Sequence, residues 1–156
     1  MAEASDGQIN GTELGVYIAG TAVANLIAYS TNATLNINHS TRSTSNKESG
    51  GWEESMEGVR SWDVSCDALY AWLEPDGTAL TKTSLSDMFT TYMYTRTEFE
   101  LVWGKGYMAS GDGWTKYTGN AWISSISING ANEDTATFTV NFQGTGELVQ
   151  HIDTSP

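Results

Sequence analysis

Basic residues, cysteine and proline are scarce in this chain of 156 residues, which contains 7 Lys and Arg, 1 Cys and 2 Pro. With 19 Asp and Glu the net charge is −12, and so acidic a protein repels phosphate, which argues against conventional nucleic-acid binding. The single cysteine, Cys66, rules out an internal disulfide framework. No apolar run approaches transmembrane length and no Lys or Arg precedes Arg42, so we expect neither a membrane anchor nor a signal peptide.

The chain also lacks the residue combinations that catalysis or metal binding requires. Its 2 histidines are His39, on the inward parity of a predicted strand, and His151, in a terminal tail, so no nucleophile–base pair is indicated. Glu98 and Glu100 lie roughly 7 Å apart on one strand face, but two carboxylates on one edge cannot easily flank a sugar from opposite sides. Residues 104–109 match Gly-x-Gly-x-x-Ala, yet no helix is predicted after them. We expect no catalytic site, no metal site and no cofactor.

What the sequence does contain is period-two alternation at residues 34–40, 61–68, 124–129 and 135–142. Side chains on a strand point alternately to opposite faces, so each stretch predicts a strand with one apolar face and one polar face. The polar faces carry hydroxyls, amides and a few carboxylates, whereas an ordinary solvated sheet face would also carry Lys. With 16 Gly and abundant Ser and Thr, the composition favours an all-β domain rich in turns.

The remaining segments predict an all-β fold with one short helix and two packed antiparallel sheets, as in a β-sandwich or barrel. Further strands are predicted at residues 13–18, 23–29 and 99–103. Ser84 and Asp87 form a capping-box pattern that begins a helix of about three turns. The apolar stripe of this helix should be buried against the sheets and consists of Leu85, Met88, Phe89 and Tyr92.

The sequence predicts one domain with a long internal loop. Residues 1–11 are predicted to be a flexible N-terminal arm, residues 12–148 the β domain and residues 149–156 a C-terminal tail. The connection at residues 43–58 is far longer than a hairpin needs. It brackets Trp52 with glycines and glutamates, and an exposed aromatic residue there favours docking on a neighbouring subunit. The alternative is a loop whose Trp52 folds back on its own domain.

Three parts of the sequence resemble the major tail proteins that form the tail tube of long-tailed bacteriophages. They are residues 9–17 (INGTELGVY), residues 41–54 (TRSTSNKESGGWEE) with residues 57–62 (EGVRSW), and the closing hairpin at residues 132–148. The resemblance covers about residues 8 to 148. It implies a structural protein that assembles as hexameric rings, which stack into a tube around the tape-measure protein.

The resemblance also implies partners and a location. The partners would be other copies of the chain, the tape-measure protein, tail terminator and tip proteins, and DNA that passes through the lumen without specific binding. The protein would be assembled in the bacterial host cytoplasm and reside in the virion tail. A channel that conducts DNA must not bind it, and basic residues that neutralise even about six to ten phosphates would bind the DNA tightly. Polar strand faces without basic residues suit that requirement.

We therefore expect the polar faces to line the channel and the long loop to join subunits. The candidate lumen-facing residues are Asn36, Asn38, Ser61, Asp63, Ser65, Asp67, Ser125, Ser127, Thr137 and Thr139. The candidate intersubunit residues are Lys47, Glu48, Trp52, Glu53 and Glu54. Asp63 and Asp67 lie roughly 13 Å apart on one strand face, so six copies would repeat them into acidic belts. The alternative is that this face is simply exterior.

Two other functions share these features. A carbohydrate-binding or adhesin-like β-sandwich would place Trp52, Trp114 or Trp122 on a concave exposed face, with residues 110–118 as its best candidate. A tube protein of a contractile tail or secretion device would have the same architecture as the phage tail tube. Rings or tubes in electron micrographs would support a tube protein, whereas a discrete monomer that binds immobilised glycan would support the carbohydrate-binding module.

Overall fold

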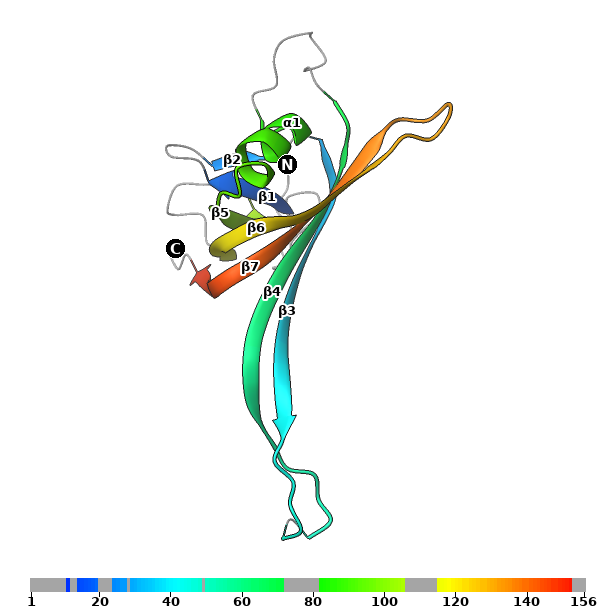
Figure 1. Ribbon diagram of the computed structural model, residues 1–156. Coiled ribbons are helices and arrows are strands. Elements are labelled where there is room, and N and C mark those ends of the chain that lie inside the picture. The colour runs from blue at the N-terminus through cyan, green and yellow to red at the C-terminus, as the bar shows by residue number, and fades with distance from the viewer. Residues whose placement is uncertain are drawn as a thin grey trace, which may run out of the picture.

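The computed structural model describes residue 11 and residues 14–19, 24–27, 29–48, 50–71, 82–105 and 115–152. Its strands are β1 (Leu14–Ala19), β2 (Ala24–Leu26), β3 (Ser30–Ser43), β4 (Ser55–Leu69), β5 (Phe99–Lys105), β6 (Thr115–Asn129) and β7 (Thr137–Ile152). A short helical segment consists of α1 (Leu85–Asp87) and the π-helix η2 (Met88–Met93) that continues it. The predicted all-β fold with one short helix is confirmed (Figure 1).

The seven strands belong to one antiparallel sheet with the order β2-β1-β5-β6-β7-β4-β3. The prediction of two separate packed sheets is not confirmed, because backbone pairing continues from one edge strand to the other. The sheet nevertheless curls on itself. Its two edges are β2, which ends at Leu26, and β3, which begins at Ser30. Leu26 and Ser30 are four residues apart in the chain and therefore at most about 14 Å apart in space, so the two edges approach each other at this corner and the sheet encloses its apolar face.

Apolar side chains from alternate strand positions meet in this enclosed space, as the alternation predicted. Those from β4 and β7 are Trp62, Val64, Cys66, Ala68, Phe138, Val140 and Phe142, and all are buried. β1 and β5 contribute Val16, Ile18, Phe99 and Leu101 to the same cluster. Burial, together with the charge of Asp67, raises the pKa of the Cys66 thiol to about 12, so this thiol remains protonated and acts as a small core residue.

The helical segment begins as predicted but departs from α-helical geometry after one turn. The Ser84 hydroxyl accepts a hydrogen bond from the Asp87 amide at 3.2 Å, and the Asp87 carboxylate accepts one from the Ser84 amide at 3.1 Å, which confirms the capping box. Farther along, the Tyr94 amide donates to the Phe89 carbonyl at 2.8 Å, five residues back. This i→i+5 pattern widens the turns of η2 relative to an α-helix.

The burial of the helical segment differs from the predicted apolar stripe. Leu85 and Met88 are buried and Tyr92 is partly buried, but Phe89 is 52% exposed. The prediction that Phe89 is buried is therefore wrong. It assumed an uninterrupted α-helix with a period of 3.6 residues, whereas the segment is π-helical from Met88 to Met93.

Beyond the body, β3 and β4 continue as a two-stranded ribbon that we call the arm, which consists of residues 37–62. β4 pairs with β7 only from Asp63 to Leu69, so the preceding residues of β4 pair with β3 alone. The loop at the end of the arm spans residues 44–54 and is shorter than the predicted 43–58, because both strands extend farther. The arm projects well away from the body (Figure 1). His39 has the inward parity that the sequence indicated but is exposed, because the arm has no covering layer.

Trp62 lies where the arm leaves the body. Its indole N–H donates to the Gly146 carbonyl at 3.3 Å, and the Gln143 side-chain amide donates to the Trp62 carbonyl at 3.2 Å. A Cβ atom at Gly144 would lie 2.1 Å from the indole Cε2 atom, and one at Gly119 would lie 2.5 Å from Cζ2. Because neither position has room for a side chain, the two glycines let the indole pack directly on the backbone of β6 and β7. This contact fixes the root of the arm.

Candidate lumen and assembly surfaces

The ten predicted lumen residues lie on one side of four adjacent strands. β3, β4, β7 and β6 are neighbours in the sheet, and their outward positions align in rows, such as Thr34, Ser65, Asn141 and Ser125. The ten residues are Asn36, Asn38, Ser61, Asp63, Ser65, Asp67, Ser125, Ser127, Thr137 and Thr139, and we call the surface that they form the polar face. It is the side of the sheet opposite the core, since the residues between them in β4 and β7 are buried.

The two carboxylates of the polar face each accept hydrogen bonds from neutral donors. Asp63 accepts from the Asn36 amide at 2.8 Å and from the Asn38 amide at 3.3 Å. Asp67 accepts from the Thr139 hydroxyl at 2.6 Å and from the Asn32 amide at 3.4 Å. These bonds hold both carboxylates across neighbouring strands without neutralising their charge.

The polar face also contains residues that the sequence analysis did not propose as lumen residues: Asn32, Asn141, Gln143 and Trp122. The Asn141 amide donates to the Ser125 hydroxyl at 2.9 Å, and Trp122 is the cross-strand partner of Gln143. The alternation gives the side of each strand, but it does not give the register between strands. The cross-strand register is what brings Asn32 to Asp67, so only a register prediction could have identified these partners.

Basic side chains are absent from the four stretches that build the polar face. Residues 34–38, 61–67, 125–129 and 137–141 contain no Lys or Arg. The charged groups in these stretches are the carboxylates of Asp63 and Asp67. The surface therefore offers a negative potential and many neutral hydrogen-bonding groups, a combination that stays wet and repels polyanions.

The loop at the end of the arm holds Trp52 in solvent. Trp52 is 82% exposed, so the alternative in which it folds back on its own domain is wrong. Polar groups of the loop's described residues bond to one another: the Glu54 amide donates to the Ser45 hydroxyl at 2.7 Å, and the Glu48 amide donates to the Asn46 side-chain oxygen at 2.7 Å. The other candidate intersubunit residues, Lys47, Glu48, Glu53 and Glu54, are also exposed.

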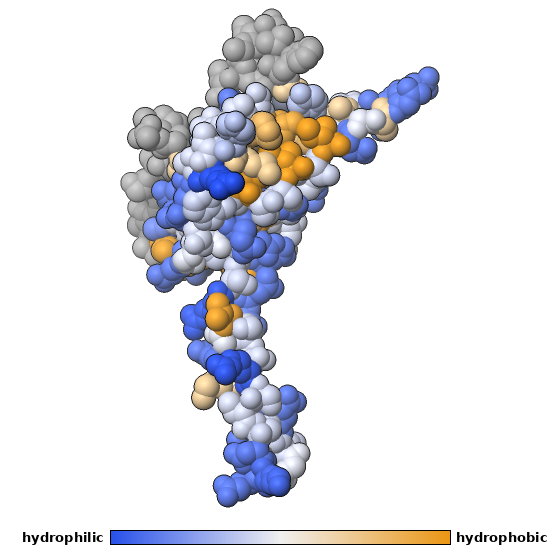
Figure 2. Space-filling view, in the orientation of Figure 1, coloured by the Kyte–Doolittle hydropathy of each residue, from blue (hydrophilic) through white to orange (hydrophobic). Residues whose placement is uncertain are grey.

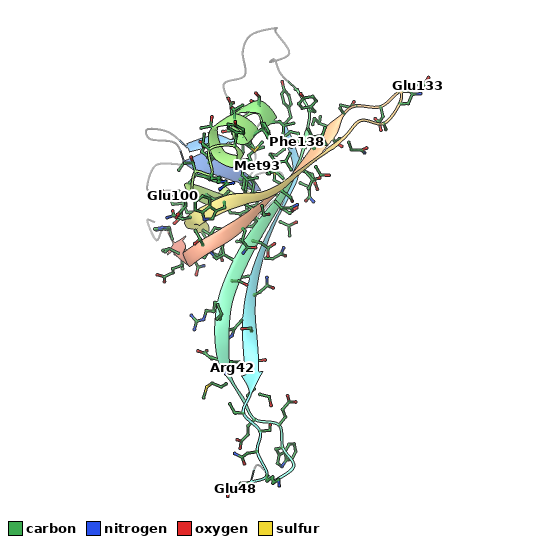
Figure 3. The ribbon with its side chains drawn as sticks, viewed as in Figure 1. Arg42, Glu48, Met93, Glu100, Glu133 and Phe138 are labelled. Atoms are coloured by element: carbon green, nitrogen blue, oxygen red, sulfur yellow. The ribbon has the colours of Figure 1, made fainter. Side chains whose placement is uncertain are left out.

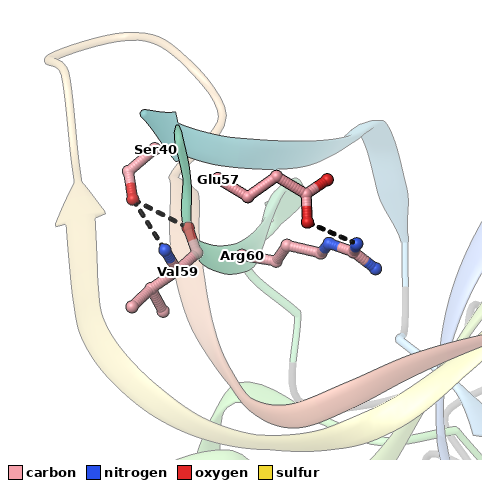
Figure 4. A network of polar contacts seen from close by, with 4 residues as sticks. All are labelled: Ser40, Glu57, Val59 and Arg60. Atoms are coloured by element: carbon pink, nitrogen blue, oxygen red, sulfur yellow. Dashed lines mark hydrogen bonds and ion pairs between the residues drawn. The ribbon is translucent and has the colours of Figure 1, made fainter. Parts of the chain in front are cut away.

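A β-bulge interrupts the arm between its root and its loop. Pairing passes from His39↔Arg60 to Thr41↔Glu57, so Gly58 and Val59 on β4 oppose Ser40 alone. The Ser40 hydroxyl replaces the missing ladder bonds, because it accepts from the Val59 amide at 2.8 Å and donates to the Val59 carbonyl at 3.0 Å (Figure 4). The extra residue also brings Glu57 and Arg60 to one side, with their charged atoms 3.7 Å apart. A bulge of this kind bends a ribbon and increases its twist.

The residues that the sequence offered as candidates for catalysis do not lie together in one site. His39 lies on the arm, and His151 lies within β7, which continues through the predicted tail to Ile152. The Nε2 atom of His151 is 2.9 Å from the Thr118 hydroxyl. Glu98 and Glu100 share an open pocket of about 360 Å³ with Glu147, and no histidine or cysteine lines it. Of the Gly-x-Gly-x-x-Ala segment, Gly104 and Lys105 end β5, and residues 106–109 lie outside the described ranges.

Within the described part of the chain, no group of three or more His, Cys, Asp or Glu is placed to hold a metal ion. No helix in that part is long and apolar enough to cross a membrane. The tryptophans proposed for carbohydrate binding do not gather on one surface: Trp52 is at the end of the arm and Trp122 is on the body. Trp114 and the rest of residues 110–114 lie outside the described residues.

Known proteins match this chain in sequence and in fold. Residues 14–150 match the family described as phage tail tube protein, and no curated protein sequence matches the chain. The tail of an empty gene transfer agent (GTA) particle, computed with helical refinement and C6 symmetry, superposes with a TM-score of 0.71 at 19% identity, over 91% of this chain and 98% of that one. The virion of the native GTA particle gives a TM-score of 0.69 at 19% identity, over 92% and 99%. The SPP1 tail tube gives 0.67 at 12% identity, over 94% and 82%.

Proposed function

The chain belongs to the phage tail tube protein family and is a structural subunit of a tail tube, and we propose that its polar face lines the lumen of stacked hexameric rings. The observation that carries this proposal is the continuity of the polar face over four neighbouring strands with no basic residue in the stretches that build it. Sixfold copy number is supported by the C6 symmetry of the similar GTA tail. In such a ring, Asp63 and Asp67 would form two acidic belts around the channel.

The edges of the polar face support assembly by strand pairing. Among the described residues, β3 pairs only with β4, and residues 122–129 of β6 pair only with β7. Each of these edges leaves backbone N–H and C=O groups that can pair with another chain. If β3 of one subunit lies beside β6 of the next, six subunits close into one barrel with the polar faces inside. Such a head-to-tail contact forms a ring when its rotation closes.

The lumen first encloses the tape-measure protein and later conducts DNA. Neutral hydroxyls and amides keep the wall hydrated, so that it binds neither the tape-measure protein nor DNA strongly. The carboxylates repel the phosphates of the DNA. The end rings contact tail terminator and tip proteins, and assembly takes place in the host cytoplasm. In this proposal the protein has no enzymatic role, because its function is to form the wall of the channel.

Reversal of charge on the polar face tests the proposal. Asp63→Lys with Asp67→Lys removes two half-buried carboxylates that accept hydrogen bonds, so urea denaturation must show that the subunit still folds. Electron microscopy first establishes that rings and tubes form. In virions with such tubes, lysines in the lumen should hold DNA electrostatically and slow its ejection, and high salt should relieve the effect.

Asp63→Asn with Asp67→Asn is the matched control, because it removes the same carboxylates without adding a positive charge. Its ejection rate should stay close to that of the wild type. Normal and salt-insensitive ejection through well-formed lysine tubes would contradict the assignment of the polar face to the lumen. If the wild-type protein never forms rings or tubes, the proposal that it assembles into a tube is wrong.

A further inference from the structure

Among the described residues of the body, one group of apolar side chains is exposed to solvent. It lies beside η2 at the root of the β6–β7 hairpin, where Figure 2 shows apolar residues gathered and Figure 3 labels Met93 and Phe138. We call it the helix-end surface; it consists of Phe89, Met93, Tyr94, Ile126 and Ile128. Phe89, Tyr94 and Ile128 are exposed, and Ile128 is 60% exposed although its strand parity is inward. The rings of Phe89 and Tyr94 lie 6.4 Å apart, so they form one aromatic platform.

A second uncovered apolar group lies on the arm. Trp52, Met56 and Val59 are all exposed, and they occupy the loop and the strand that follows it. Isolated apolar residues on a surface need no explanation, but grouped ones mark interaction sites. Large aromatic residues such as Trp52 are also the type that anchors protein interfaces.

The two surfaces cannot meet within one molecule. The arm projects from one end of the body, and α1 and η2 lie at the other end (Figure 1). A contact between them must therefore join two copies head to tail, and repetition of such a contact builds a stack instead of a closed dimer. This direction agrees with a tube of stacked rings, in which each arm reaches toward the next ring.

The charges beside the two surfaces are complementary. Trp52 is followed directly by Glu53 and Glu54, whose carboxylates are exposed. The helix-end surface is followed by Arg96, an exposed cation whose backbone amide donates to the Met93 carbonyl at 3.3 Å. Complementary charges at the edge of an apolar contact orient the partners and speed their association.

We propose that the end of the arm docks on the helix-end surface of a copy in the adjacent ring, with Trp52 on the Phe89–Tyr94 platform and Glu53 and Glu54 facing Arg96. The proposal rests on the function proposed above, because it names the surface that receives the arm in a stacked tube. It also explains why η2 leaves Phe89 in solvent, since the exposed ring becomes part of the platform.

Cross-linking between two chains, each with one added cysteine, tests the contact. One chain carries Ser55→Cys, just after the loop, and the other Thr90→Cys, next to Phe89, so that Trp52, Phe89 and Tyr94 stay in place. The native Cys66 is buried, so its thiol does not compete. A short bis-maleimide added to mixed tubes should give a cross-linked dimer on a denaturing gel, whereas tubes of either chain alone should give several-fold less. Ser125→Cys in place of Thr90→Cys is the control, because it puts the thiol on the polar face, and it should give no product.

The outcomes separate this inference from the proposed function. Intact tubes in which Ser55→Cys joins Ser125→Cys, or fails to join Thr90→Cys, would overturn the docking surface and leave the tube subunit standing. A product in isolated single rings would show that the arm docks within a ring, which also overturns the proposal. If none of the chains forms tubes, both proposals fail.

Charge reversal gives an independent readout. Arg96→Glu, or Glu53→Arg with Glu54→Arg, should each raise the protein concentration needed for tubes roughly tenfold, and the two changes combined should restore much of the loss. A combined variant no better than either parent would show that these charges do not face each other. Ser86→Glu, on an exposed position of α1, is the control for added charge and should assemble normally.

Discussion

The body and the arm use the same alternation of polar and apolar residues, but they place it in different surroundings. Trp62 and Ile37 are direct cross-strand partners on the inward side of β4 and β3, yet Trp62 is 3% exposed and Ile37 is 61% exposed. Trp62 is covered because it lies on Gly144 and Gly119, whereas Ile37 lies just beyond the neighbouring strands. Alternation therefore predicts which way a side chain points, and the neighbouring strands decide whether anything covers it.

The two tryptophans of the β3–β4 hairpin should separate stability from assembly. Trp62→Ala removes a buried ring from the root of the arm and should lower the free energy of unfolding by about 3–5 kcal/mol. Trp52→Ala, the matched control, should leave the unfolding midpoint of the unassembled subunit nearly unchanged and impair tube formation. Urea denaturation of unassembled protein and electron microscopy measure the two effects. Equal destabilisation by both variants would mean that the arm and the body share one core.

A smaller contrast is expected within the helical segment, between its covered and uncovered sides. Met88→Ala should cost about 2–5 kcal/mol, because Met88 is fully buried. Phe89→Ala should cost about 1 kcal/mol or less, because half of its ring is already in water. Thermal or urea unfolding of the two variants measures the difference, and a larger loss from Phe89→Ala would show that an α-helical stripe, not the π-helical turn, describes this segment.

The cap of the same segment contributes less. Ser84→Ala removes the hydroxyl that accepts from the Asp87 amide and should lower the free energy of unfolding by about 1 kcal/mol. Ser84→Asp keeps an acceptor and should retain most of the stability. If the alanine variant unfolds at the wild-type urea concentration, the capping box does not contribute to the stability of the body.

The smallest effect on overall stability is expected from the arm itself. Ser40→Ala removes two hydrogen bonds to Val59 and should loosen the bulge by about 1 kcal/mol. The global unfolding midpoint should not change, because the arm is outside the cooperative core. Hydrogen exchange at the Val59 amide should become faster while exchange at Val64 stays slow. A drop in the global midpoint would contradict the separation of arm and body.

The parts that the sequence predicted are those set by local rules. The inward positions of β4 and β7 follow from a period of two, and the Ser84–Asp87 box follows from cap chemistry three residues apart. The same rules placed the lumen candidates on one side of their strands. That this side lines a channel stays a prediction, as does the role of the loop around Trp52 in joining subunits.

The parts that the sequence missed depend on residues far apart in the chain. The exposure of Phe89 on η2 and of His39 on the arm depends on whether other elements cover these positions. The single curled sheet follows from the short connection between its two edge strands. Identifying these two strands as the edges requires the strand order. The partners of Asp67, Asn32 and Thr139, depend on cross-strand register.

The narrowness of the arm has a mechanical consequence. A ribbon of two strands resists bending far less than a curled sheet of seven, so the elastic compliance of each subunit is concentrated between Trp62 and the loop. The bulge at Ser40 lowers the local stiffness further, because a hydroxyl replaces part of the regular ladder there. If the arms link neighbouring rings, a load that curves the tube is absorbed as flexure of these ribbons. The cross-section of the lumen then stays constant, because the arms deform elastically while the rings remain rigid.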